Sequence, residues 1–337
     1  MTLADVLAAS VILALNAYAV LAGADFGGGV WGLLASGPSR AQQRDLVAHA
    51  IGPVWEANHV WLILAVVLLF TCFPPAFAEL GIALHIPLSL ALIGIVLRGA
   101  AFTFWRYGGG EKARERYWGQ VFAAASLITP LLLGMVVGAI AAGRIGEVGR
   151  GPAAGFYATY VGPWLTPFAL SVGVFAVVAF AFLAAVYLTL ETDDEALREA
   201  FRRRALGAGI ALFLAALVVL LLARGGAPRV LAGLVFAPWA LPLHLLTAAM
   251  AVTALGALWR RRYRIARIAA GIQVSLILWG WALSQYPYAL PPDFAIPDVA
   301  APAATLRLTL IVLAVGAVIL LPSLYYLFRV FKAPPVS

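Results

Sequence analysis

The chain has 337 residues, of which 64% are hydrophobic and only 11% are charged. Its mean hydropathy of +0.96 excludes a soluble domain, because such a composition cannot supply a polar surface. The net charge of +8 would suit nucleic acid, but the basic residues occur in short clusters between apolar runs. That pattern is typical of a polytopic membrane protein, so we exclude nucleic acid. The single cysteine, Cys72, excludes an internal disulfide and a cysteine-ligated metal site.

Nine apolar runs are long enough to cross a bilayer, which takes about 20 residues. They cover roughly residues 3–33, 49–73, 77–105, 117–142, 162–190, 204–223, 239–259, 264–285 and 304–331. The N-terminus has no basic segment before the first run, so we expect no removable signal peptide. The sequence therefore predicts one all-α membrane domain over residues 1–337.

The predicted spans fall into two groups and one extra helix. Four spans lie in residues 1–142 and four in residues 162–285, so each group brings the chain back to the side where it began. This predicts two four-helix bundles, followed by a ninth helix at 304–331. A parallel internal repeat is compatible with the pattern, although the sequence similarity between the halves is too weak to establish it.

The basic residues in the connections predict the orientation in the membrane. Sixteen follow the odd-numbered spans: Arg40, Arg44, Arg106, Lys112, Arg114, Arg116, Arg198, Arg202, Arg203, Arg204, Arg260, Arg261, Arg262, Arg264, Arg329 and Lys332. Only four follow the even-numbered spans: Arg144, Arg150, Arg224 and Arg229. Because positive residues concentrate in cytoplasmic connections, the N-terminus should lie outside and the C-terminus in the cytoplasm.

Three charged residues lie well inside predicted spans. Asp25 lies eight residues before the cytoplasmic end of the first span, and Glu56 lies seven after the start of the second. Arg98 lies seven before the end of the third. At 1.5 Å per residue, all three are about 10 to 12 Å inside the cytoplasmic edge of the helices. His59, one turn deeper than Glu56 on nearly the same face, would extend this layer toward the membrane centre.

Two explanations for this layer compete. In the first, Arg98 pairs with Asp25 or Glu56, and the ion cluster only holds three helices in register. In the second, one arginine cannot neutralise two carboxylates, so the surplus acid holds a transferable proton near neutral pH. Acids and histidines in a row are the usual groups of a membrane proton relay. The second explanation predicts a proton-loading site reached from the cytoplasm.

The other histidines do not suggest a haem site. His49 lies at a helix end, and His85 and His244 lie toward the outer halves of the third and seventh spans. No two histidines share a depth on obviously facing helices, and a single membrane histidine more often serves helix packing. We therefore expect no haem or metal ligand in this chain.

Several segments resemble a known family. They are LAGADFGGGVWGLL (21–34), IGPVWEANHVWLILAVVLLFTCFPPAFAEL (51–80), LRGAAFTFW (97–105), GWALSQYPYALPPDFAI (280–296) and APAATLR (301–307). In order and spacing, over nearly the full length, the chain resembles subunit II of the cytochrome bd quinol oxidases. The resemblance implies a subunit of an oxygen-reducing, electrogenic quinol oxidase in the inner membrane of a prokaryote.

The resemblance also implies how such a subunit works. Its nine helices pair pseudosymmetrically with subunit I, which carries two b-type haems, one d-type haem and the site of quinol oxidation. Subunit II lacks haem ligands, stabilises the complex and lines a path for protons or oxygen. We expect it to be inactive alone. A structural quinone or lipid, and small single-helix subunits, are further partners that the resemblance leaves open.

Position by position, the family motifs include the residues of the buried layer. Asp25 matches the acid of the first motif, Glu56 the acid after the tryptophan of the second, and Arg98 the arginine of the third. The chain departs from the family at His59, where members often have a glutamate, which leaves the route of the protons open. The alternative function is a proton-coupled secondary transporter, which would also use buried acids and glycine-rich helices.

Overall fold

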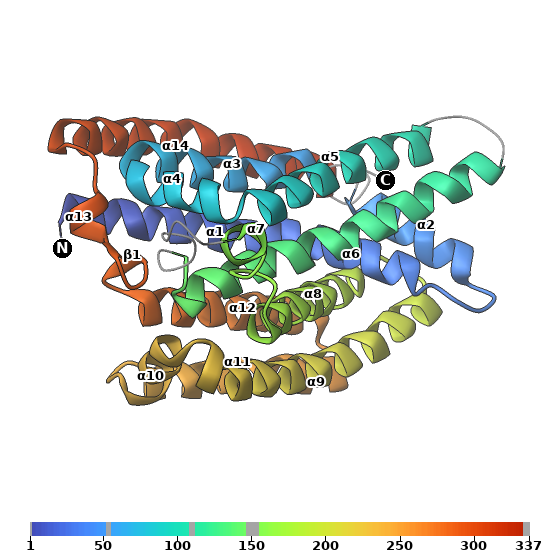
Figure 1. The fold of residues 1–337 in the computed structure, drawn as a ribbon. Helices are drawn as coiled ribbons and strands as arrows, with labels where there is room; N and C mark the ends of the chain where they lie inside the picture. The colour runs from blue at the N-terminus through green and yellow to red at the C-terminus, as the bar shows by residue number, and fades with distance from the viewer. Residues whose placement is uncertain (1, 52–54, 108–111, 146–154, 333–337) are drawn as a thin grey trace.

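The computed structural model describes residues 2–51, 55–107, 112–145 and 155–332. Almost all of this part is helical (Figure 1), because a segment without access to water must pair its backbone groups internally. A few side chains inside these ranges, including that of Glu56, lie outside the described part.

The elements follow in chain order. They are α1 (Leu3–Leu33), α2 (Arg40–Ile51), α3 (Trp55–Cys72), α4 (Pro74–Ala83), α5 (His85–Tyr107), α6 (Lys112–Ala142), α7 (Phe156–Tyr160), α8 (Pro167–Leu188), α9 (Glu195–Gly226), α10 (Pro228–Phe236), α11 (Ala240–Trp259), α12 (Tyr263–Gln285), β1 (Tyr288–Leu290), β2 (Phe294–Ala295), α13 (Ile296–Val299) and α14 (Ala303–Lys332). The two strands pair antiparallel as a short hairpin.

The prediction of an all-α polytopic membrane fold is confirmed. In the described residues, eight helices are long and apolar enough to cross a bilayer: α1, α5, α6, α8, α9, α11, α12 and α14. Helices α3 and α4 make a ninth span if they are counted together, although they are bent by 117° at their junction. The bend falls at Phe73, whose non-helical backbone precedes Pro74, because a residue before proline is disfavoured in the α conformation.

Two predicted boundaries need correction. The predicted span 77–105 is divided, because α4 ends at Ala83 and α5 begins at His85. The predicted span 49–73 starts too early, since residues 49–51 belong to α2 and α3 begins at Trp55. Glu56 is therefore the second residue of α3 rather than the eighth residue of a continuous span. The last residues of α2, Ala50 and Ile51, are apolar, so the apolar run in the sequence begins before α3 does.

Helix α1 is the centre of the fold. It packs against α3, α6, α8 and α12, while α14 and α3 lie on one side of it and α9, α10 and α11 on the other (Figure 1). Glycine allows α1 and α8 to approach closely, because a Cβ at Gly27 would lie 1.9 Å from the carbonyl oxygen of Phe180 in α8. Small residues of this kind let membrane helices approach closely.

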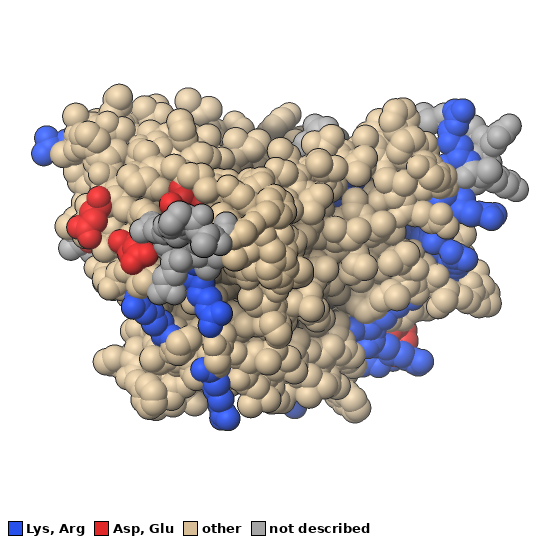
Figure 2. All heavy atoms as spheres, in the orientation of Figure 1, with Lys and Arg blue, Asp and Glu red and all other residues tan. Residues whose placement is uncertain are grey.

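Basic side chains gather at one end of the helices, to the right in Figure 2. That end holds α2, the start of α9 and the turn between α11 and α12, with Arg40, Arg44, Arg198, Arg202, Arg203, Arg204, Arg260, Arg261 and Arg262. We call it the basic end. Glu199 of α9 forms ion pairs with Arg202 at 2.7 Å and Arg203 at 3.1 Å in the same helix. Its ion pair with Arg261, at 3.5 Å, connects α9 to the α11–α12 turn.

Candidate proton-loading site

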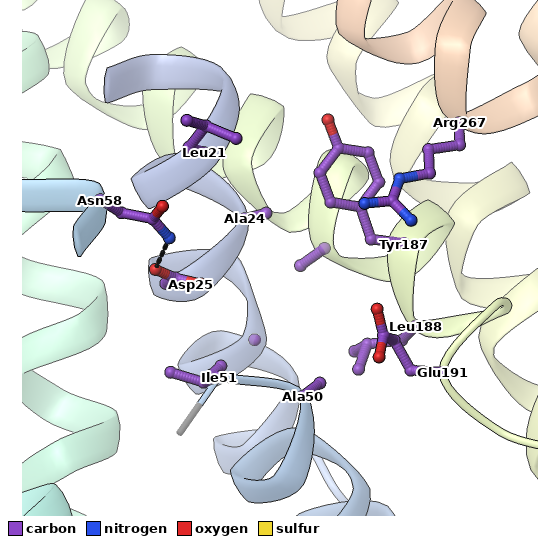
Figure 3. Close-up of a pocket in the computed structure, with 12 residues that line it drawn as sticks. Leu21, Ala24, Asp25, Ala50, Ile51, Asn58, Tyr187, Leu188, Glu191 and Arg267 are labelled. Atoms are coloured by element: carbon purple, nitrogen blue, oxygen red, sulfur yellow. Dashed lines mark hydrogen bonds between the residues drawn. The ribbon is translucent and has the colours of Figure 1, made fainter. Parts of the chain in front are cut away.

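Asp25 lies in the most tightly packed part of α1. Its neighbours from Ala22 to Val30 are almost all buried, and the Asp25 side chain is itself only 7% exposed. Asn58 of α3, 3% exposed, donates a hydrogen bond from Nδ2 to Asp25 Oδ2 at 2.6 Å (Figure 3). A hydrogen bond to a carboxylate is among the stronger ones in proteins, and it fixes the acid in place.

Arg98 of α5 is buried completely, with 1% of its surface exposed. Its Nε donates to Ser126 Oγ of α6 at 3.2 Å, and its guanidinium lies over the rings of Phe26, at 4.8 Å, and Phe122, at 5.0 Å. Aromatic faces attract a cation in place of water. A Cβ at Gly29 would lie 2.2 Å from Ser126 Oγ, so only glycine leaves room for this hydroxyl.

The charges of Asp25 and Arg98 interact through space, but the described residues form no direct ion pair between them. Arg98 is instead held by Ser126 and two aromatic rings. The first explanation, in which Arg98 pairs with Asp25 or Glu56, stays a prediction, because side chains outside the described part also belong to this layer. A pair of Arg98 with Glu56 falls on a side chain outside the described part and stays a prediction.

His59 lies beside this layer, one turn after Trp55 on α3. Its ring is surrounded by three others, with centroid distances of 5.6 Å to Tyr18, 5.9 Å to Phe26 and 6.0 Å to Trp55. Phe26 contacts both the His59 ring and the Arg98 guanidinium. The structure thus brings His59 and Arg98 into one group of contacting side chains through Phe26. Asp25, which precedes Phe26 in the chain, is bound to Asn58, which precedes His59.

Several buried polar atoms near this group have no hydrogen-bond partner among the described residues. They are Tyr18 Oη, Asn58 Oδ1, His59 Nδ1, Trp61 Nε1, Arg98 Nη2 and Thr129 Oγ1. Buried polar groups in native proteins are nearly always satisfied, and internal water is the usual partner when protein atoms are not. In the interior between α1, α3, α5 and α6, water and the side chains outside the described part are the partners that remain for these atoms.

A cavity of about 70 Å³ opens beside Asp25 between α1, α2, α8 and α12 (Figure 3). Its volume allows a few water molecules. Asp25 and Asn58 lie on one side, and Tyr187, Glu191 and Arg267 lie on the other. A volume of about 70 Å³ is too small for a haem, so we place no haem chemistry in this cavity.

Sequence reasoning found Asp25 and Arg98 because a charge within an apolar run is conspicuous. It missed Tyr18, Ser126 and Glu191. A tyrosine or serine in a span, and an acid just after one, are common, and only the rotation of each helix shows which of them face the site.

The fold and the site define a polytopic helical membrane protein with a buried charge layer beside a cavity that has room for a few water molecules. A family model described as cytochrome bd terminal oxidase subunit II matches residues 3–331. The chain belongs to this family.

The relatives agree with this assignment. A Bacillus subtilis protein described as a cytochrome bd menaquinol oxidase subunit II is 26% identical over 326 residues, covering 93% of this chain and 91% of that protein. Cytochrome bd-I ubiquinol oxidase subunit 2 of Escherichia coli K12 is 27% identical over 156 residues, covering 45% and 40%. The solved bd oxidase from Geobacillus thermodenitrificans matches with a TM-score of 0.78 and 26% identity, covering 98% of this chain and 99% of that chain.

The chain is therefore a subunit of a cytochrome bd quinol oxidase, a haem-containing oxidoreductase complex of a bacterial respiratory membrane. The comparisons do not favour the alternative, a proton-coupled secondary transporter.

Proposed function

We propose that this chain stabilises the haem-bearing subunit I and carries protons from the cytoplasm toward the site of oxygen reduction. The path consists of Asp25, Glu56 and His59, with Arg98 as the charge partner. Electron transfer from quinol to oxygen takes place on haem, and we place two b-type haems and one d-type haem on subunit I. The basic end faces the cytoplasm, as the distribution of arginines indicates.

The observation that supports this function best is the environment of Asp25. A carboxylate in the interior of a membrane protein is costly unless it has a purpose, and such residues commonly mark ion or proton pathways. Here the acid is buried, is held by Asn58 and borders a cavity of water size. A fixed carboxylate next to water can accept a proton and pass it on.

Arg98 has a different task in this path. Its guanidinium stays charged at all relevant pH values, so it cannot relay protons itself. Its positive field lowers the cost of a deprotonated Asp25 in the interior. The acid can therefore release its proton and become ready for the next one.

Asp25→Asn tests this proposal in the purified two-subunit oxidase. The amide keeps the size and most of the hydrogen bonding but cannot exchange a proton. We expect a normal haem spectrum and a quinol oxidase turnover reduced by about tenfold or more, a smaller loss than the contribution of about 10²- to 10⁴-fold that one acid–base group makes to a chemical step. The deficit should be greatest at alkaline pH, where protons are scarce.

Asp298→Asn is the matched control, since Asp298 is an exposed acid in α13, outside the membrane spans. It should leave turnover unchanged. Wild-type turnover of fully assembled Asp25→Asn across the pH range would refute a path through Asp25.

A further inference from the structure

The cavity beside Asp25 reaches the second half of the chain. Asp25 and Asn58 belong to α1 and α3, but the opposite wall is made by Tyr187 of α8, Arg267 of α12 and Glu191, three residues beyond the end of α8 (Figure 3). The buried layer predicted from the sequence lies entirely in α1, α3 and α5. The cavity therefore extends the site toward residues that the predicted path does not include.

Glu191 is an acid of the cavity lining that also reaches the surface. It is partly exposed and belongs to the connection between α8 and α9, at the basic end of the bundle. Asp25, in contrast, is buried. The cavity thus has an acid in contact with the surface on one side and an acid in the interior on the other, with room for water between them.

Arg267 and Tyr187 line the same side of the cavity as Glu191. The Arg267 guanidinium lies 5.0 Å from the centroid of the Tyr187 ring. Asp25, Tyr187, Glu191 and Arg267 are the titratable or charged groups of the lining, and the residues that α2 contributes, Ala50 and Ile51, are apolar. The polar groups of the lining therefore come from α1, α3, α8, α12 and the connection after α8.

We propose that this cavity is the water-filled entrance of the proton path, and that Glu191 is its proton-collecting residue. This inference rests on the proposed function and adds where the protons come in. A proton from bulk water binds the Glu191 carboxylate, passes to a water of the cavity and reaches the Asp25 carboxylate. Glu191 is left as a carboxylate and is ready for the next proton.

The charges of the lining favour water over a lipid headgroup as the occupant. Two carboxylates, from Asp25 and Glu191, face the cavity together with a single guanidinium. An anionic phosphate would lie next to two like charges in a poorly solvated place, which is costly. Water and protons avoid that repulsion.

Glu191→Gln in the intact oxidase complex tests the entrance. We expect a normal haem spectrum, and a turnover and a rate of proton uptake on oxygen addition that both fall by about tenfold or more, most strongly at alkaline pH. Asp193→Asn is the matched control. It removes the same charge from the same connection, but its side chain is fully exposed and does not line the cavity. It should leave both rates unchanged, which separates a collecting role from a general effect of surface charge.

Filling the cavity is an independent test. Ala24 lines it, so Ala24→Leu should displace water and slow proton uptake while Glu191 and Asp25 stay intact. Ala248→Leu adds the same side chain on an exposed part of α11 and should have no effect. If Ala24→Leu prevents assembly, as judged by the loss of haem absorbance, Glu191→Gln decides alone.

The two proposals can fail separately. Slow turnover in Asp25→Asn with wild-type proton uptake in Glu191→Gln would overturn the entrance and leave the path through Asp25 intact. Wild-type rates in both variants would overturn the proposed function as well. An equal slowing in Glu191→Gln and Asp193→Asn would also overturn the entrance, because the effect would then follow surface charge.

Discussion

At the scale of single residues, Arg98 shows how a full charge is kept inside a membrane protein. Among the described residues, its guanidinium donates one hydrogen bond to a hydroxyl, lies over two aromatic faces and is attracted by the charge of Asp25. Each of these interactions offsets part of the free-energy cost of removing Arg98 from water. Because Asp25 and Arg98 act through space, the removal of either one changes the cost of keeping the other.

We predict that Arg98→Leu destabilises the complex. Without the guanidinium, the Asp25 carboxylate loses its compensating charge, and breaking a buried pair costs about 3 to 5 kcal/mol, which is an upper limit for two groups not in direct contact. Haem absorbance per membrane protein should fall, and the double variant Arg98→Leu/Asp25→Asn should recover part of it. Arg307→Leu, which removes an exposed arginine of α14, is the control. A double variant no better than the single one would argue against the coupling.

The sequence predicted the residues of this layer better than their contacts. Asp25 and Arg98 could be found by depth alone, since hydropathy fixes position along a helix axis to within a few residues. Which groups they meet depends on helix rotation and on packing distance. The bond from Asn58 to Asp25 and the position of Arg98 between Phe26 and Phe122 therefore needed the structure.

At the scale of elements, the contact between α1 and α8 fixes the geometry of the site. Gly27 lies against the backbone of Phe180, and Trp31 Nε1 donates to the carbonyl of Ala181 at 2.7 Å. Both contacts involve backbone atoms of α8, which cannot move aside as a side chain can. Because Asp25 is two residues from Gly27, this packing also sets the width of the cavity between the helices.

We predict that Gly27→Ala forces α1 and α8 apart. The added methyl group would overlap a carbonyl oxygen, and overpacking of this kind costs about 1 to 3 kcal/mol. The temperature at which the purified complex loses its haem absorbance should fall. Gly32→Ala is the matched control on the same helix, because a Cβ there has no atom within 4 Å. Equal melting temperatures for Gly27→Ala and wild type would contradict the assigned packing.

Element boundaries were predicted less well than the existence of the spans. A run of about 20 apolar residues shows that a helix crosses the bilayer, but it does not show where the helix bends. The 117° turn between α3 and α4 follows from Pro74, yet the apolar run continues through it, so hydropathy alone could not divide it. The start of the second span was predicted too early for a related reason, since residues 49–51 belong to α2 although they continue the apolar run.

At the scale of the whole molecule, much apolar surface remains exposed. In the most apolar window of α14, only 6% of the residues are buried within the chain, and in those of α9 and α11 the share is 17% each. Such surfaces suit lipid or a second membrane subunit. In the oxidase complex, subunit I is the membrane partner that the family implies for this surface.

We predict that the chain is inactive without subunit I. Expressed alone and purified in mild detergent, it should be colourless and should not oxidise quinol, because in the proposed division of roles this chain carries protons and the haems belong to subunit I. Co-expression with subunit I should give a coloured complex that oxidises quinol. Quinol oxidation by the isolated chain would contradict this division of roles.

Proton uptake during a single turnover tests the central claim most directly. Oxygen is added to the fully reduced complex, and a pH-sensitive dye follows the protons while absorbance follows haem oxidation. The account predicts that Asp25→Asn slows proton uptake by about tenfold or more while the first phase of haem oxidation stays at the wild-type rate. Wild-type proton uptake in fully assembled Asp25→Asn would contradict it.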